Sequence, residues 1–227
     1  MQNLVAASVY FLLIHFGVSG TRLRDALVAR IGEGPYRGLF SVASILGLIW
    51  VIYAYRHAPT VPLWQSPSPL RPLAYAVVFV AFLLVVIGIS TPSPTQAGGE
   101  ARLVAGADPL RGIVRITRHP FLWGVALWAL VHVAMNGDLA SLILFGTMLL
   151  LGVGGPFSID AKRRRALGER WTHFAQATSN VPFGAVLAGR NSLYAALNEI
   201  GILRPVAAII LFALIFYFHG RFFGQPL

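Results

Sequence analysis

The 227-residue chain is strongly apolar and strongly basic: 56% of its residues are hydrophobic, 11% are charged, and the formal net charge is +10. This composition is typical of a chain whose main solvent is lipid. The charge comes from 17 arginines and one lysine placed between apolar runs, which indicates topology signals and lipid contacts and excludes a nucleic-acid surface. The absence of cysteine excludes disulfides, iron–sulfur clusters, thiolate haem ligation and cysteine nucleophiles.

Six segments are long and apolar enough to cross a hydrocarbon core of about 30 Å, which needs roughly 17–25 helical residues. We therefore predict an all-α fold, a polytopic membrane helix bundle in one domain over residues 1–227, with a cytoplasmic helical segment within 158–200. The N-terminal run lacks a basic n-region and a cleavage site, so we expect it to be retained as the first span. The expected spans lie near residues 3–19, 36–56, 70–90, 119–136, 138–157 and 201–219.

Basic residues predict how these spans are oriented. With the N-terminus outside, 15 of the 18 Lys and Arg residues fall in inner loops, and Arg56, Arg71 and Arg221 fall outside. The positive-inside rule therefore places both termini on the outer, periplasmic side of a bacterial inner membrane.

The linkers between the spans differ in kind. Residues 20–35 carry apolar side chains at helical spacing with arginines opposite, which predicts a short amphipathic helix in the membrane interface. Residues 57–69, with four prolines and Trp64, are expected to form an extended outer loop. A Pro/Gly/Ser-rich inner loop follows at residues 91–108.

Two further features concern the fifth span. Gly137 and Asp138 alone join it to the fourth span, which predicts a tight antiparallel hairpin. At its other end, residues 161–176 are expected to form a cytoplasmic helix that continues from the span.

Histidines inside apolar spans are the main functional candidates, because an ionisable group in lipid is expensive and marks a functional site by default. His15 shares one helix face with Ser8 and Ser19, a polar stripe expected to face protein. A helix–helix hydrogen bond and a metal or haem ligand are both compatible with this spacing. His132 lies near the outer end of the fourth span.

His119 precedes Pro120 and so takes an N-cap position, where a capping or headgroup role is the alternative to ligation. It lies about 20 Å from His132 along the helix axis, so these two cannot ligate one iron. His15 with His132, at an expected difference in depth of about 12 Å, and His15 with His119 are the two candidate pairs. Imidazole pairs suit a b-type haem, and the lack of a C-x-x-C-H motif excludes covalent attachment.

The remaining histidines are interpreted as structural. Two border outer loops and one lies in a basic cytoplasmic segment; they are His57, His219 and His173.

Arg118-His119-Pro120, Gly124 and His132, with the hairpin that follows, resemble the NnrU family of bacterial membrane proteins. The opening HFGVSGTRLRDAL and the segment GPYRGLFSVASILGLI extend the resemblance over most of the chain. The same pattern is similar to the 15-cis-zeta-carotene isomerases, in which a histidine-ligated haem b isomerises a carotenoid double bond when it is reduced.

This resemblance implies haem b as cofactor, with His15 and His132 on the iron and His119 as the alternative ligand. It implies a lipophilic polyene as substrate, or a role beside nitrite and nitric oxide reduction, since the NnrU family is associated with denitrification. Electron donor and catalytic residues stay unassigned. Three arginines are expected near haem propionates at the inner surface, namely Arg22, Arg24 and Arg118.

A second resemblance is to membrane methyltransferases of the isoprenylcysteine carboxyl methyltransferase type. In those enzymes an RHP segment and a following Glu-Glu pair hold S-adenosylmethionine, whereas here Asp160 is the one carboxylate at the place of that pair. The alternative function is thus a cytoplasmic S-adenosylmethionine site around Arg118, His119, Asp160 and Trp171. A third, non-enzymatic interpretation is a membrane assembly factor. The matching positions are Arg118, His119, Gly124, Leu167, Gly168, Trp171, Phe174 and Pro182.

Overall fold

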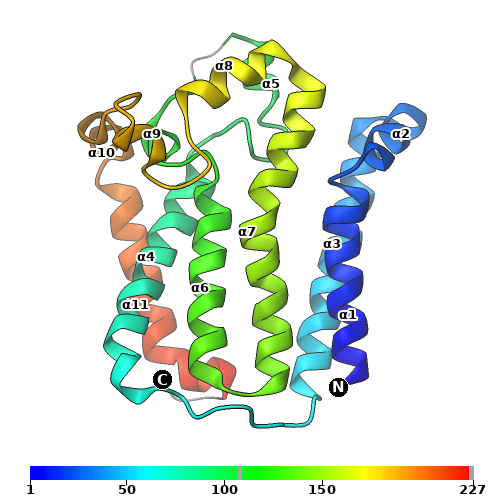
Figure 1. Cartoon of the computed structure of the whole chain (residues 1–227), viewed down its shortest axis with the longest axis vertical. Helices are drawn as coiled ribbons and strands as arrows, with labels where there is room; N and C mark the ends of the chain where they lie inside the picture. Colours follow the sequence, from blue (N-terminus) through cyan, green and yellow to red (C-terminus); the bar gives the residue numbers. More distant parts are fainter. Residues whose placement is uncertain (107–108, 225–227) are drawn as a thin grey trace. The chain divides into compact units, whose positions relative to one another are not determined.

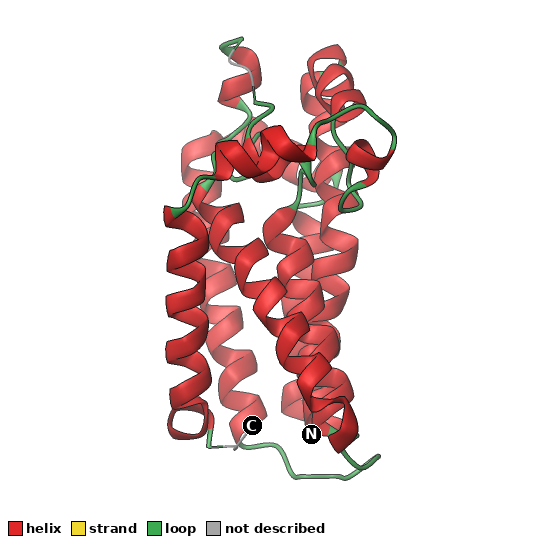
Figure 2. Ribbon diagram, turned by 90° about the vertical axis from the view of Figure 1, so that its left-hand side faces the viewer, coloured by secondary structure: helices red, strands yellow, loops and turns green. Residues whose placement is uncertain are grey.

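The computed structural model describes residues 1–106 and 109–224, so residues 107 and 108 of the expected inner loop lie outside the described residues. Every regular element in these ranges is helical, apart from one isolated β-bridge between Pro62 and Asp138. Figures 1 and 2 show the helices and the loops that join them.

Four helical segments are long and apolar enough to cross a membrane. A fifth is Gln2–Val18, if it is counted with α2 (Arg22–Ile31), from which it is bent by 76°. The predicted all-α polytopic membrane helix bundle is therefore confirmed. The four are α3 (Glu33–Arg56), Ser68–Ser90, which joins η2 (Ser68–Leu70) to α4 (Arg71–Ser90), α7 (Leu139–Leu167) and α11 (Leu203–Phe223).

The helix α6 (Pro120–Asn136) covers the predicted fourth span and is apolar, but at 17 residues it is shorter than the four long segments. The sixth span and the orientation of the termini stay predictions. The chain divides into two compact units, one made of Met1–Arg71 with Ala129–Lys162 and the other of Pro72–Trp128 with Arg163–Leu227. They are called unit 1 and unit 2 below.

In unit 1, α1 (Gln2–Leu12) packs along α3. The indole Nε1 of Trp50 donates to Asn3 Oδ1 at 2.9 Å, so the start of α1 lies beside the later part of α3. The helices approach closely at Gly47, where a Cβ would lie 2.8 Å from the Tyr10 ring. The apolar core of this pair comprises Leu4, Ala7, Phe11, Val51, Ala54 and Ala140.

The first apolar helix changes geometry before it ends. α1 passes into η1 (Leu13–Val18), a π-helical turn. Thr21 then caps α2, its Oγ1 accepting from the Leu23 N–H at 3.2 Å. The amphipathic helix predicted within 20–35 is confirmed as α2, but α3 begins at Glu33 directly after Gly32, so the second helix starts earlier than the predicted residue 36.

The predicted turn between α6 and α7 is confirmed. Gly137 adopts a positive φ of 71°, and its carbonyl accepts from the N–H groups of Leu63 and Trp64 at 2.8 and 3.1 Å. The Trp64 indole also donates to the Ala134 carbonyl at 3.1 Å. The loop over residues 57–69 is therefore bonded to the hairpin turn between α6 and α7.

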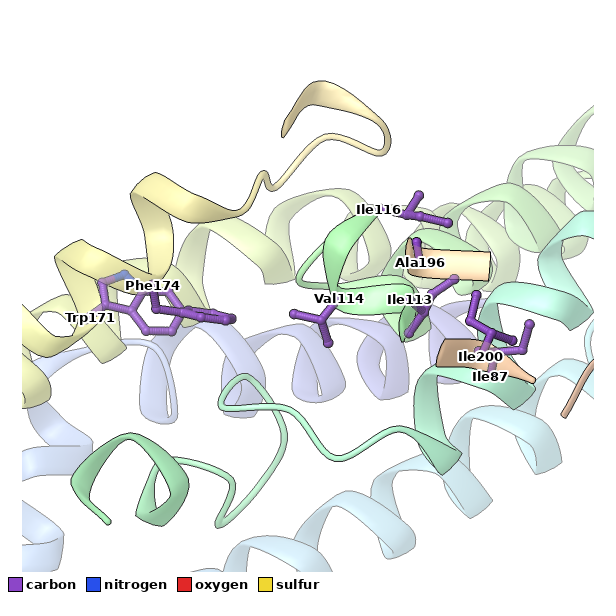
Figure 3. Close-up of a cluster of buried hydrophobic side chains, with 8 residues drawn as sticks. All are labelled: Ile87, Ile113, Val114, Ile116, Trp171, Phe174, Ala196 and Ile200. Carbon is purple, nitrogen blue, oxygen red and sulfur yellow. The ribbon is translucent and has the colours of Figure 1, made fainter. Parts of the chain in front are cut away.

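Unit 2 has its largest apolar core where short helices meet the end of α4 (Figure 3). Trp171 is completely buried and Phe174 nearly so. The other members of the cluster are Ile87, Ile113, Val114, Ile116, Ala196 and Ile200. These come from α4, η3 (Gly112–Arg115) and its flank, α8 (Glu169–Ala177) and α10 (Leu193–Ile200). Two further one-turn helices are α5 (Ala101–Val104) and α9 (Gly184–Leu187).

The prediction of one continuous helix over residues 161–176 is wrong. α7 continues as predicted but ends at Leu167, and Gly168 has a φ of 54° before α8 begins at Glu169. A left-handed residue cannot continue a right-handed helix, so the chain changes direction there. This break brings Trp171 and Phe174 into the core of unit 2.

Candidate functional site: histidines and arginines of the two units

His15 lies in the π-helical turn η1 of unit 1. Its Nδ1 is 2.8 Å from the carbonyl oxygen of Phe11. Because a carbonyl oxygen can only accept, Nδ1 carries the proton and Nε2 of the neutral ring keeps its lone pair. This arrangement is the usual second bond of a metal-binding histidine. π-turns are also frequent at functional sites.

Aromatic rings surround His15 on two helices. The Phe11 ring centroid lies 4.5 Å away and that of Phe40 lies 5.3 Å away, on α1 and α3 respectively. Tyr36 stacks on Phe40 at 6.0 Å. The imidazole is half-buried in this apolar shell, which suits a flat aromatic ligand better than a hydrated ion.

His132 occupies a different part of unit 1, near the end of α6. Its ring lies 4.6 Å from that of Phe145 on α7. Phe145 in turn lies 6.3 Å from Tyr55, whose hydroxyl is hydrogen-bonded to Ser141 Oγ at 3.0 Å. His132 therefore belongs to an aromatic cluster beside the last turn of α3.

Helix α3 gives the difference in depth between these two histidines. His15 lies beside Phe40 and His132 lies at the level of Tyr55, and these two α3 residues are 15 positions, or about 22 Å, apart along the axis. Imidazole nitrogens lie about 2 Å from a bound metal, so two ligands of one ion lie within about 4 Å of each other. The structure thus does not bring His15 and His132 together, and their separation exceeds the 12 Å expected from the sequence.

His119 lies in unit 2 and is 3% exposed. Its backbone N–H donates to Thr117 Oγ1 at 3.2 Å, and its carbonyl accepts from Trp123 N at 3.1 Å in the first turn of α6. The predicted N-cap position of His119 is confirmed: its carbonyl accepts the first backbone hydrogen bond of α6. The Thr117 side chain accepts from the N–H of His119 itself.

The three arginines predicted to meet haem propionates differ in how their charge is used. Arg24 Nη2 lies 2.7 and 2.8 Å from the two Glu33 carboxylate oxygens, and its guanidinium lies over the Tyr36 ring at 5.4 Å. Arg118 Nη1 lies 3.4 Å from both the Ala175 carbonyl and Thr178 Oγ1, and its guanidinium lies 6.0 Å from the Trp171 ring. Arg22 is exposed on α2.

The residues that resemble the methyltransferase pattern lie in unit 2, where they have packing roles, except Asp160, which lies in unit 1. The Trp123 indole and the Thr117 hydroxyl both donate to the Asn180 carbonyl, at 2.8 and 2.6 Å. Gly124 allows α6 to approach α4, since a Cβ there would lie 2.7 Å from Val85 Cγ2 and 2.8 Å from the Ala81 carbonyl. Among the remaining positions, Leu167 packs against the core of Trp171 and Phe174, Gly168 ends α7, Pro182 is half-buried, and Asp160 is 9% exposed.

Sequence reasoning missed an ion pair between elements far apart in the chain. Glu199 on α10 accepts from Arg115 Nε and Nη2, each at 2.8 Å, and from the Gly112 N–H at 2.7 Å. The Arg115 guanidinium, with a smaller contribution from the Gly112 amide, holds the pKa of the Glu199 carboxyl below its ordinary value. The partners are 84 residues apart, so no local sequence pattern predicts the pair.

A groove between α1 and α7 was also missed. It has a volume of about 430 Å³ and is lined by apolar side chains with Ser8, Gly146 and Thr147 among them. Ser8 is 4% exposed, as expected of the face it shares with His15, and its Oγ has no hydrogen-bond partner among the described residues. Leu12, at one end of the lining, precedes His15 by one helical turn. In the described ranges, no three His, Asp or Glu side chains gather as a metal site would require.

Comparisons with known proteins identify the family to which the chain belongs. The chain is 25% identical over 224 residues to a chloroplastic 15-cis-zeta-carotene isomerase of Zea mays, covering 97% of this chain and 58% of the relative. It is 25% identical over 221 residues to the chloroplastic 15-cis-zeta-carotene isomerase of Arabidopsis thaliana, covering 96% of this chain and 58% of the relative. The chain thus spans less than two thirds of the length of these relatives. No solved structure matches significantly. Residues 3–227 match the family described as NnrU protein, and the chain is therefore a member of the NnrU family of membrane proteins.

Proposed function

We propose that this NnrU-family protein binds haem b in a bacterial inner membrane and carries out redox-dependent cis–trans isomerisation of a lipophilic polyene. The similarity to 15-cis-zeta-carotene isomerases over nearly the whole chain supports the class of reaction. The apolar groove between α1 and α7 supports a ligand that enters from the bilayer. If bound, haem b would supply the redox-active iron that this chemistry requires.

The observation that carries this proposal is the hydrogen bond from His15 Nδ1 to the Phe11 carbonyl, which leaves Nε2 with a lone pair among aromatic rings. The chemistry of this site fits a haem: if haem b binds here, His15 Nε2 would bind its iron and the Phe11 and Phe40 rings would contact the porphyrin. Arg22 on the next helix is the exposed cation available for a propionate, because Arg24 is already paired with Glu33. His132 and His119 are the alternative ligands, and the 22 Å difference in depth makes His132 an alternative to His15 rather than its partner on one iron.

The test is the absorbance spectrum of the full chain purified after expression with haem supply, oxidised and dithionite-reduced. We expect a Soret band that shifts on reduction. His15→Ala should abolish or shift it, while His132→Ala and His119→Ala show which of the alternatives contributes.

His57→Ala is the matched control. His57 Nδ1 makes the same bond to the carbonyl four residues earlier, Tyr53, at 2.7 Å, but His57 is exposed at the end of α3. This variant should keep the wild-type spectrum. Wild-type protein without a Soret band, or an unchanged spectrum in His15→Ala, contradicts the proposal.

The reaction itself is tested by incubating haem-loaded protein in liposomes with a cis-configured carotene, with and without dithionite, and separating the isomers by chromatography. Conversion in the reduced sample alone supports the isomerase. Haem binding without conversion favours an accessory role in nitrite or nitric oxide respiration, the alternative that the family association suggests. Absence of haem together with intact folding favours the non-enzymatic assembly role.

A further inference from the structure

The segment of unit 2 that joins α8 to α11 exposes many large apolar side chains. Leu187 is 86% exposed, Tyr194 77% and Leu197 58%. The sequence assigned this segment to a polar cytoplasmic block, for which such exposure to water would be costly. Contiguous exposed apolar surface in a folded protein marks an interaction site.

Helix α10 cannot rotate to bury these side chains. Ala196 and Ile200 on its inner face belong to the core of unit 2 (Figure 3). On the same side, the Glu199 carboxylate is bonded to Arg115 and to the Gly112 N–H. At about 100° per residue, Tyr194 and Leu197 fall about 60° apart on the outer face, and Leu193 lies at the border between this face and the inner one. The packing therefore fixes this apolar face outward.

The outer face of α10 continues into a membrane-spanning helix. Gly201, with a φ of 70°, and Ile202 are the two residues between α10 and α11. Arg204 Nη1 donates to the Ile200 carbonyl at 2.8 Å, which fastens the end of α10 to the first turn of α11. Ile202 and Leu203 are 72% and 81% exposed, so the apolar surface is unbroken from α10 to the exposed apolar residues of α11.

The chemistry around α10 matches a bilayer surface. Arg190 is exposed just before the helix, with its Nη1 donating to the carbonyls of Gln176 and Thr178, and Tyr194 places a phenol on the outer face of the helix. Arginine and tyrosine are enriched at the level of lipid headgroups. Phe183, in the turn before α9, has a left-handed φ of 64° and a 45% exposed ring, and its N–H is bonded to the Ile116 carbonyl at 2.8 Å. A strained non-glycine residue that presents an aromatic ring outward is the kind of outlier that accompanies function.

We infer that α10 is an interfacial helix, with Tyr194 and Leu197 inserted at the boundary between headgroups and acyl chains and Arg190 beside the phosphates. Its partner is the lipid surface itself. The inference does not depend on the proposed function. A helix in this position would hold the core formed by η3, α8 and α10 at the level where α11 enters the membrane.

The experiment uses the natural absence of cysteine. Leu197→Cys and Tyr194→Cys, each in the full chain, are labelled with a nitroxide and reconstituted in phosphatidylcholine–phosphatidylglycerol liposomes. Asn198→Cys is the control, since Asn198 is exposed on the same helix but lies at the edge of the apolar face. Collision rates with oxygen, which concentrates in lipid, and with a nickel chelate, which stays in water, are compared.

The ratio of oxygen to nickel collisions should be severalfold higher at positions 194 and 197 than at position 198. Equal ratios, with free access of the nickel chelate to all three sites, would show that α10 lies in water and overturn the inference. Low collision rates with both reagents at positions 194 and 197 would show that protein covers the face and would overturn it as well. Because all three side chains are exposed, a circular dichroism spectrum equal to that of wild type confirms that each variant is folded.

Discussion

His15 in unit 1 and Arg115 in unit 2 differ in how much of their hydrogen-bonding capacity is taken up by other residues. In unit 1, His15 uses Nδ1 for the Phe11 carbonyl, and no described residue bonds its Nε2. In unit 2, Arg115 uses Nε and Nη2 for Glu199 and Nη1 for Asn191. The first residue retains a nitrogen lone pair for a ligand, whereas every guanidinium nitrogen of the second already donates to a residue far away in the chain. Spare bonding capacity therefore identifies the functional candidate better than charge does.

If the polar and aromatic groups of unit 2 are structural and His15 is kept for a ligand, the largest loss of stability is expected for Trp171→Ala. Removing a completely buried tryptophan should lower the free energy of unfolding by about 3–5 kcal/mol. His15→Phe, which keeps an aromatic ring within the shell of Phe11 and Phe40, should cost less than about 1.5 kcal/mol. Denaturant titration in detergent micelles, followed by circular dichroism, measures both. Equal losses in the two variants would remove the distinction between the units.

The Arg115–Glu199 pair should give the next largest effect. Glu199→Gln removes the charge of an acceptor that holds α10 to η3, and a charge-assisted hydrogen bond contributes about 1.5–3 kcal/mol. The control is Glu169→Gln, at an exposed position in the first turn of α8. The same denaturant titration applies, and a loss no greater than that of the control would mean that the pair does not fasten α10.

The same pair predicts a pH dependence. Its partners hold the pKa of Glu199 below the ordinary value of 4.5, so the ionised form is favoured by folding. The stabilisation is therefore fully present above pH 4.5 and is lost as the pH falls through the lowered pKa. Melting temperatures in detergent should decline less steeply below pH 4.5 in Glu199→Gln than in wild type. Parallel curves for the two proteins would contradict this assignment.

The smallest effect is expected when S-adenosylmethionine, the cofactor of the methyltransferase alternative, is added to the protein. Arg118 is already bonded to the Ala175 carbonyl and Thr178 and lies over Trp171, so S-adenosylmethionine should bring no heat of binding in calorimetry. Measurable binding that disappears in Arg118→Ala would reverse the assignment and place the ligand site in unit 2.

Hydropathy and turn chemistry were sufficient to predict most of the helices. The apolar runs predict the long helices, and Gly137-Asp138 predicts the turn before α7. The break at Gly168 was missed because a single glycine in a helix costs only about 1 kcal/mol, which the surrounding arginines and leucines can offset. The glycine acts through its φ of 54°, which composition does not reveal.

The candidate site was predicted in part. The location of His15 in an apolar helix follows from the sequence, but the π-turn and the bond to Phe11 depend on local packing. The depth of His132 was placed by centring each span separately. In the structure, Gly137 is bonded to the loop over residues 57–69 that follows α3, which puts His132 near the end of that helix and far from His15.

The bonds between the loop over residues 57–69 and the turn between α6 and α7 also have a consequence for biosynthesis. Trp64 leaves the ribosome 70 residues before Ala134, whose carbonyl accepts from its indole. Until α6 and Gly137 have been synthesised, the N–H groups of Leu63 and Trp64 must bond to water. The loop therefore stays hydrated until Gly137 can accept these bonds. The two parts of unit 1 can therefore come together only after the whole of Pro72–Trp128, the first segment of unit 2, has been synthesised between them. The packing of the N-terminal part of unit 1 is thus completed only after α6 has been synthesised.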